Sequence, residues 1–159
     1  MSRSVLLALR VLLALLFGGA LATQLTSGVI AGTVPSAGPA TVLTILIIVG
    51  ALSAEVVLLS VWMLVGMVAT ERIFHERGQA DRWVSAAICA LFAGAAAGLA
   101  GLGYFLLVQA LAAAPWAVPL IVLTGAAAGA GAALALVVVV MRRLLHTAIS
   151  LRSELDEVV

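Results

Sequence analysis

An acidic residue, Glu55, lies in the middle of a long apolar segment of this sequence. The surrounding stretch, 50–62, reads GALSAEVVLLSVW and contains no other ionisable side chain. An acidic residue at the centre of a membrane helix costs about 2.5–3.5 kcal/mol on insertion scales, and such residues generally face other helices and mark proton or ligand sites. Glu55 is therefore the first candidate for a functional residue.

The sequence places no cation at the depth of Glu55. The nearest arginine on the preceding segment, Arg10, lies about 10 Å or more away along the membrane normal at 1.5 Å per residue. Because burial disfavours a charged carboxylate, we expect a neutral carboxyl that is hydrogen-bonded to a neighbour such as Tyr104 or a backbone carbonyl. Two interpretations remain open. Glu55 is a proton relay, cation relay or ligand contact, or its hydrogen bond only fixes helix packing.

The composition indicates which elements position this carboxyl. Of the 159 residues, 65% are hydrophobic and 9% are charged, and the mean hydropathy is +1.30. Soluble domains are nearer half apolar and a quarter charged. A membrane-crossing helix needs about 20 apolar residues. The sequence therefore predicts an all-α, polytopic membrane protein, a single membrane domain over 1–159, with spans at about 5–25, 41–69, 84–114 and 117–141 and a tail at 142–159.

Helix-breaking residues separate these spans. The segment 24–40 is rich in glycine and proline, and Pro115 and Pro119 flank Trp116 between the third and fourth spans. Proline lacks an amide hydrogen and disrupts helix interiors, so these positions indicate helix ends.

The positive charges lie on one side of this four-span arrangement. The chain has no lysine and eight arginines, at positions 3, 10, 72, 77, 82, 142, 143 and 152. All fall in or near the N-terminus, the 70–83 loop and the tail, so the positive-inside rule predicts that both termini and this loop are cytoplasmic. The absence of lysine and asparagine is typical of a GC-rich genome, and we expect a multi-pass protein of a bacterial inner membrane.

A cleaved signal peptide is the competing interpretation of the first span. Arg3, an apolar stretch and the small residues around 20–22 fit such a peptide, and cleavage would leave three spans. Arg10 interrupts the apolar stretch. A retained first helix, with the long side chain of Arg10 reaching the headgroups, is the interpretation we favour.

Small residues form two similar motifs on the third and fourth spans, GAAAG at 94–98 and GAAAG at 125–129. Small residues four apart allow helix backbones to approach closely in lipid. Packing of the third span on the fourth is the simpler interpretation, and a homodimer face is the alternative. The helix-packing candidates are Gly94, Gly98, Gly125 and Gly129.

No motif for catalysis is present. The predicted loops are short, and we find no phosphate loop, no nucleophile elbow and no metal-spaced set of histidines and cysteines. The single cysteine, Cys89, excludes an intrachain disulfide. We therefore expect no enzyme activity, no catalytic residues, no metal, no cofactor and no direct binding of nucleic acid.

The tail carries an apolar stripe. Leu144, Ala148, Leu151, Leu155 and Val158 are spaced 4, 3, 4 and 3, which predicts a short cytoplasmic helix that continues the fourth span. This helix either folds against the 70–83 loop or binds a partner by inserting into a groove. The partner-binding candidates are Leu144, Leu151, Arg152, Glu154, Leu155 and Asp156, together with Arg72, Phe74, Arg77 and Arg82 in the loop.

The order of several motifs resembles a bacterial membrane family, the domain-of-unknown-function family numbered 2975. The resemblance rests on Trp62, Leu64 and Met67, on Ile73–Phe74, and most specifically on the terminal LRSELDEVV at 151–159. Met63 and His75 depart from the family pattern, which often has a basic residue and a serine there. The resemblance implies four membrane helices, no known catalytic activity, and genes that often lie beside a small helix-turn-helix regulator.

Three functional hypotheses follow. The first is a membrane partner or sensor that binds a cytosolic helix-turn-helix transcription regulator through the 70–83 loop and the tail. The second is a small proton-coupled transporter or channel that acts as a homodimer and uses Glu55. The third is a structural subunit of a larger membrane complex.

Overall fold

Four long α-helices make up the structure. The computed structural model describes residues 3–69 and 77–156, and over these ranges it contains no strand. The helices are α1 Arg3–Ala31, α2 Ala37–Ala69, α3 Arg77–Ala112 and α4 Ala117–Asp156. Each contains a segment long and apolar enough to cross a membrane, namely Leu7–Ala31, Ala37–Gly66, Asp81–Ala112 and Ala117–Leu144. The prediction of an all-α fold with four such helices is confirmed, and the chain is a multi-pass membrane protein.

The first helix is longer than its apolar pattern indicates. It continues past residue 25 through a polar stretch to Ala31, so the connection to α2 occupies only residues 32–36. The hydroxyls of Thr23 and Thr26 donate to the carbonyls of Gly19 and Ala22 at 2.9 and 2.8 Å. Because these hydroxyls are satisfied within the helix itself, the polar stretch remains helical in apolar surroundings.

Two of the four prolines lie in first helical turns, whereas Pro35 and Pro115 lie in the connections between helices. Pro39 and Pro119 are the third residues of α2 and α4. Amides in the first turn of a helix have no intrahelical acceptor, so proline is tolerated there. The turn between α3 and α4 is closed by Ala113, which has a φ of 45° and donates its N–H to the carbonyl of Gln109 at 3.0 Å. This left-handed residue ends α3 as a C-terminal cap.

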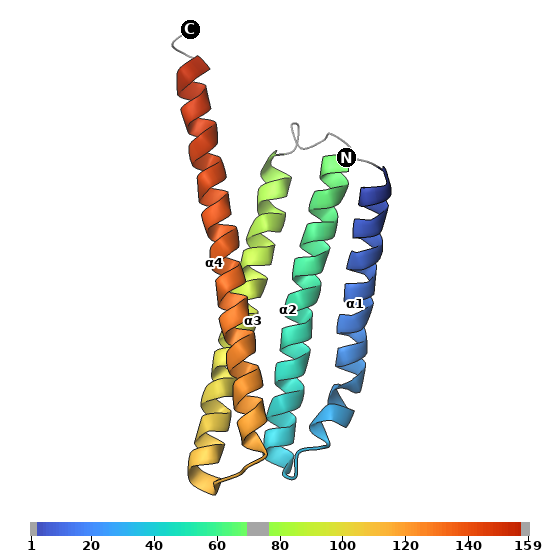
Figure 1. The fold of residues 1–159 in the computed structure, drawn as a ribbon, viewed down its shortest axis with the longest axis vertical. Coiled ribbons are helices and arrows are strands. Elements are labelled where there is room, and N and C mark those ends of the chain that lie inside the picture. The colour runs from blue at the N-terminus through green and yellow to red at the C-terminus, as the bar shows by residue number, and fades with distance from the viewer. Residues whose placement is uncertain (1–2, 70–76, 157–159) are drawn as a thin grey trace.

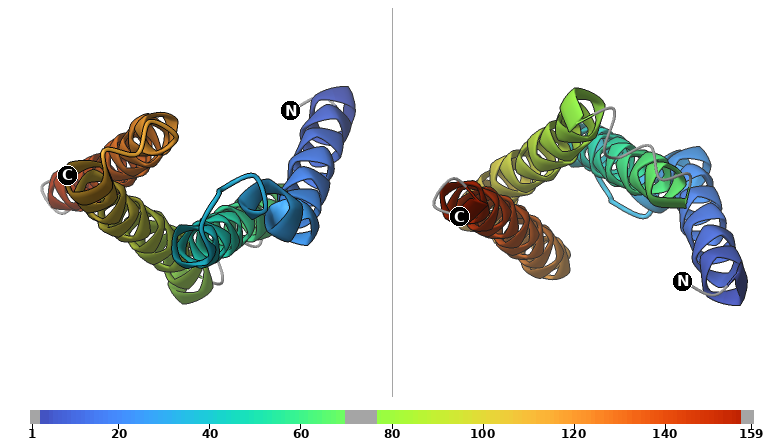
Figure 2. Two further views of the ribbon diagram at one scale, coloured as in Figure 1. Left: turned by 90° about the horizontal axis from the view of Figure 1, so that it is seen from below. Right: turned by 90° about the horizontal axis from the view of Figure 1, so that it is seen from above.

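The helices form an open array rather than a closed bundle. Over the described ranges the backbones of α1 and α2, of α2 and α3, and of α3 and α4 lie side by side, whereas those of the other helix pairs stay further apart. Viewed from either end, the four helices follow a zigzag, with α1 and α4 at its two ends (Figure 2). Over these ranges the backbone of α1 lies beside that of α2 alone, so the α1–α2 interface is the main one that positions α1.

A buried cluster lies at the end of the array that carries the two short turns. Phe105 is fully buried there, in a cluster with Ala31 and Leu43, and Trp116 and Leu120 pack against this cluster. The cluster joins residues of all four helices, at the lower end of Figure 1.

The opposite end carries the basic side chains. The first turns of α1 and α3 and the last part of α4 all lie there, at the upper end of Figure 1. With 40 residues, α4 is about 60 Å long, roughly twice the thickness of a hydrocarbon core. Residues 145–156 lie beyond its membrane-crossing segment and continue the same helix, so the predicted tail helix is a direct extension of α4.

Candidate intramembrane polar site

Glu55 is hydrogen-bonded to Gln24 across the interface between α1 and α2. The side-chain amide of Gln24 donates from Nε2 to Oε1 of Glu55 at 3.0 Å, and both side chains are half-buried. Glu55 lies near the middle of α2, and Gln24 lies two turns before the end of α1. The pair therefore ties α1 to α2 within the membrane-crossing part of both helices.

The predicted neighbour of Glu55, Tyr104, lies elsewhere. A Cβ added at Gly38 would be 3.8 Å from the Tyr104 hydroxyl, which places that hydroxyl beside the first turn of α2. The distance from Gly38 to Glu55 is about 25 Å along α2 at 1.5 Å per residue. Tyr104 instead contacts Phe105 edge to face, with ring centroids 5.4 Å apart. The expected Tyr104–Glu55 hydrogen bond is replaced by the bond from Gln24.

The position of Gln24 follows from the spacing of the residues that face α2. Leu13, Ser27 and Ala31 are buried, and Gln24 shares their side of α1 because residues three, four and seven apart lie on one helix face. Gln24 lies at the end of the first predicted span, 5–25, where the glycine- and proline-containing segment 24–40 begins, and it was not singled out as a candidate. The missed signal is this spacing, which continues the apolar face of the first span through the polar stretch.

Gln24 can hydrogen-bond to Glu55 whether the carboxyl is charged or protonated. A glutamine side chain both donates and accepts hydrogen bonds, so it can pair with a carboxylate or with a protonated carboxyl. Within the described part of the chain, Glu55 makes no other hydrogen bond and no ion pair. One carboxyl oxygen is thus left for a proton or a ligand.

A second feature of the array is a groove of about 430 Å³ lined by all four helices. Small side chains form much of its wall, among them Gly50, Ala54, Gly94, Ala127 and Gly131. Ala54 precedes Glu55, and the two side chains point to different sides of α2 because adjacent helical residues diverge by about 100°. Gln24 and Glu55 do not line this groove, although Ala20 and Leu58, each about one turn from one of them, do.

The four candidate packing glycines have different surroundings. A Cβ at Gly98 would lie 3.0 Å from the Ala128 backbone of α4, and one at Gly94 would lie 3.2 Å from the Ser53 side chain of α2. One at Gly125 would meet Leu102 at 3.6 Å, whereas Gly129 has open space around it. Of the four, Gly98 is thus the one most tightly packed against a neighbouring helix, α4, and Gly94 belongs to the α2–α3 interface.

Arg142 joins α4 to α3 at the basic end of the array. Its guanidinium donates to Ser85 at 3.1 Å and forms an ion pair with Asp81 at 3.3 Å. Arg82, on α3, is exposed, and Arg77 is the first residue of that helix. The other two candidates of the predicted loop, Arg72 and Phe74, lie outside the described residues.

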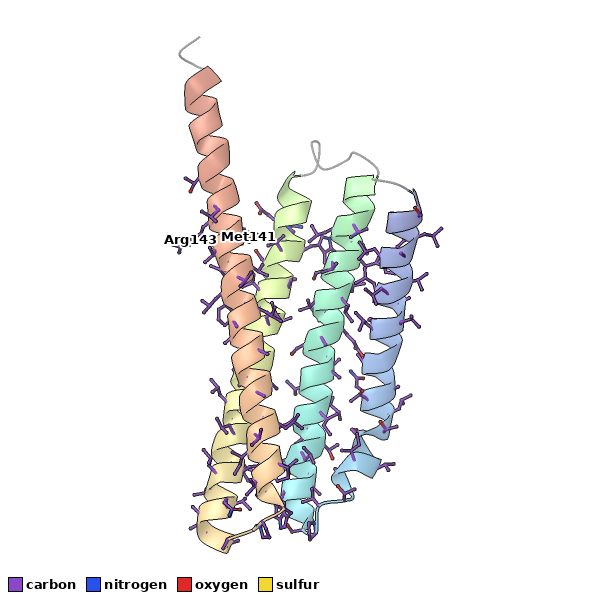
Figure 3. All side chains as sticks on the ribbon, in the orientation of Figure 1. Met141 and Arg143 are labelled. Carbon is purple, nitrogen blue, oxygen red and sulfur yellow. The ribbon has the colours of Figure 1, made fainter. Side chains whose placement is uncertain are left out.

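The predicted partner-binding residues occupy the far part of α4. Leu144 is 61% exposed, and its neighbours Met141 and Arg143, labelled in Figure 3, are also exposed. The backbone of the remaining candidates belongs to α4, whereas their side chains lie outside the described part of the structure; these are Leu151, Arg152, Glu154, Leu155 and Asp156.

Comparison with known proteins identifies the family. The model of the family described as "Protein of unknown function (DUF2975)" matches residues 8–159, nearly the whole chain. The chain belongs to the DUF2975 family. This confirms the resemblance seen in the sequence. No curated protein and no solved structure matches the chain significantly.

The DUF2975 match covers the terminal motif as well as all four membrane-crossing segments. The family description names no activity. The features of this DUF2975 protein that bear on function are its own intramembrane pair, Gln24–Glu55, and the extended α4.

Proposed function

We propose that this protein is a membrane-embedded partner or sensor for a cytosolic helix-turn-helix transcription regulator. In this proposal it resides in a bacterial inner membrane with both termini in the cytoplasm. The distribution of arginine supports the orientation, because all eight lie at the basic end of the array or in segments next to it.

The observation that carries the proposal is the continuity of α4. One helix, Ala117–Asp156, runs from the membrane-crossing segment into residues 145–156 without a break. A rigid helix transmits a shift or rotation along its length, so a change among the membrane helices would move the extension. The extension would then present or withdraw a binding surface for the partner.

The chemistry of the extension suits a DNA-binding partner. Its apolar stripe, which includes Leu151 and Leu155, fits a hydrophobic groove, and its end carries Glu154, Asp156 and Glu157. Proteins that bind DNA present basic surfaces. An acidic helix end would attract such a surface and compete with DNA for it, which is a direct way to sequester a regulator at the membrane.

Co-purification of the tagged protein from its native host in a gentle detergent tests this proposal. We expect mass spectrometry to identify a helix-turn-helix protein with the wild type, and not with a Leu151→Arg/Leu155→Arg variant. A His146→Arg/Ser153→Arg variant adds the same charge off the stripe and should retain the partner. Equal capture by the wild type and the stripe variant, with unchanged target-gene expression, would refute the proposal.

The second candidate is a small proton-coupled transporter or channel that acts as a dimer. The Gln24–Glu55 pair favours it, because the amide can hold both protonation states of the carboxyl. In proteoliposomes Glu55→Gln should then abolish proton-dependent flux. Unchanged flux would remove Glu55 from such a mechanism.

If the protein is instead a structural subunit of a membrane complex, the variants should leave flux and transcription intact, and assembly of the complex should fail.

A further inference from the structure

A narrow groove lies in the interface between α1 and α2. It has a volume of about 280 Å³ and is lined by Leu13, Ala14 and Phe17 of α1 and Leu58, Leu59 and Trp62 of α2. Phe17 and Trp62 are 36% and 41% exposed, so the aromatic walls are open to the surrounding lipid. The volume is close to the lower limit for small-molecule sites, about 300 Å³.

The Gln24–Glu55 pair lies in line with this groove. Gln24 is seven residues beyond Phe17 on α1, and Glu55 is four residues before Leu59 and seven before Trp62 on α2. Residues at these spacings share a helix face. One to two turns of helix span about 5–10 Å, so the pair lies within that distance of the lining residues Phe17, Leu59 and Trp62, on the side away from the arginines.

The groove thus has apolar and aromatic walls and lies near a single carboxyl. The amide of Gln24 occupies one oxygen of Glu55, and within the described ranges no side chain bonds the other. A bound cation would neutralise the carboxylate in surroundings of low dielectric constant, where the attraction is strong. The faces of Phe17 and Trp62 also attract cations.

We propose that this groove binds a lipophilic ammonium compound. The ammonium group contacts Glu55 beside Gln24, and the apolar or aromatic body lies between Phe17 and Trp62. An anionic amphiphile has no cationic group to pair with the carboxyl of Glu55. An uncharged acyl chain would leave the second oxygen of Glu55 without a partner, so charge complementarity selects the cation. The proposal goes beyond the proposed function, because it concerns a ligand and requires no cytosolic partner.

The affinity of the purified protein for a matched pair of probes tests this site. The cation is 2-phenylethylammonium, and propylbenzene is its uncharged counterpart of nearly the same shape. Trp62 reports binding by fluorescence once Trp83 and Trp116 are replaced by phenylalanine, and empty detergent micelles correct for partition of the probes. We expect the cation to bind at least ten-fold more tightly than propylbenzene.

Two variants separate the carboxyl from the groove. Glu55→Gln keeps a side chain that can hydrogen-bond to Gln24, and the preference for the cation should disappear. Ala14→Phe fills the groove without touching the pair, and binding of both probes should weaken at least ten-fold. Ala127→Phe, on the α4 wall of the groove lined by four helices and not among the residues that line the α1–α2 groove, is the matched control and should bind as the wild type does.

Several results would overturn the proposal. Equal affinity of the two probes for the wild type refutes it, whatever the variants do. A cation preference that survives Glu55→Gln excludes the carboxyl as the contact. Unchanged binding in Ala14→Phe places the site elsewhere. None of these results bears on capture of the helix-turn-helix protein, so the two proposals fail separately.

Discussion

The two outer helix pairs, α1–α2 and α3–α4, pack in different ways. Between α3 and α4 the backbones touch, since a Cβ at Gly98 would lie 3.0 Å from Ala128, and Arg142 adds a bond to Asp81. Between α1 and α2 there is a groove of about 280 Å³ and a hydrogen bond from Gln24 to Glu55. In lipid, close packing of small residues holds helices together, so the α3–α4 pair is the fixed part of the molecule.

The difference suggests a division of roles. The α1–α2 pair carries the intramembrane carboxyl and the space beside it, whereas the α3–α4 pair carries the helix that extends beyond the membrane segment. Between them, α2 packs on α3 through Ser53 at Gly94 and Leu46 at Gly101. A change at Glu55 therefore has a packed route to α4 through α2 and α3.

Enlarging Gly98 should have the largest effect on stability. In Gly98→Leu the new Cβ meets the backbone of Ala128, which cannot move away as a side chain can. We expect a loss of about 3 kcal/mol in the free energy of unfolding, at the upper end of overpacking costs. Reversible unfolding in mixed detergent micelles measures this loss.

Gly129→Leu is the matched control, because the surroundings of Gly129 are open. It adds the same side chain to α4 and should change the free energy of unfolding by less than about 0.5 kcal/mol, as surface substitutions usually do. Similar losses for the two variants would show that α3 and α4 do not meet at Gly98.

Removing the amide of Gln24 should have an intermediate effect. In Gln24→Leu the carboxyl of Glu55 is left without a partner, which costs about 1–3 kcal/mol for a buried polar group. The double variant Gln24→Leu/Glu55→Leu removes both groups and should regain most of that stability. The same measurement of the free energy of unfolding tests this prediction. Additive losses in the double variant would contradict a direct Gln24–Glu55 bond.

Breaking the ion pair at the basic end should have the smallest effect. Arg142 and Asp81 have side-chain exposures of 34% and 52%, and exposed pairs contribute about 0.2–1 kcal/mol. Arg142→Ala should therefore lower the free energy of unfolding by no more than about 1 kcal/mol, and added salt should reduce the difference. A larger loss that is insensitive to salt would mean that the Arg142 side chain stabilises α3–α4 by packing.

The sequence predicts the membrane fold because hydropathy depends only on composition along the chain. Four apolar segments and the prolines near their ends suffice to locate four helices. The end of α1 is harder to predict, since a stretch with Thr23, Thr26 and Gly28 resembles a loop. Hydroxyl groups bonded to carbonyls of their own helix explain why it is helical.

The partner of Glu55 could not be predicted in the same way. A hydrogen bond between helices depends on their relative register, which side-chain packing sets and hydropathy does not encode. Counting residues from the ends of apolar segments gives depth only to within a few turns. Residue counting therefore allowed a hydrogen bond between Tyr104 and Glu55, whereas the Tyr104 hydroxyl lies beside Gly38.

Distances between pairs of spin labels in lipid nanodiscs test the contrast between the two helix pairs most directly. With Cys89 replaced by alanine, one pair of labels at Leu12 and Met63 spans α1–α2, and another at Phe92 and Leu136 spans α3–α4; all four positions are exposed. We predict a broader distance distribution across α1–α2, and a further shift of this distribution alone in Gln24→Leu. Equal widths for the two pairs, or an α1–α2 distance unaffected by Gln24→Leu, would contradict the account.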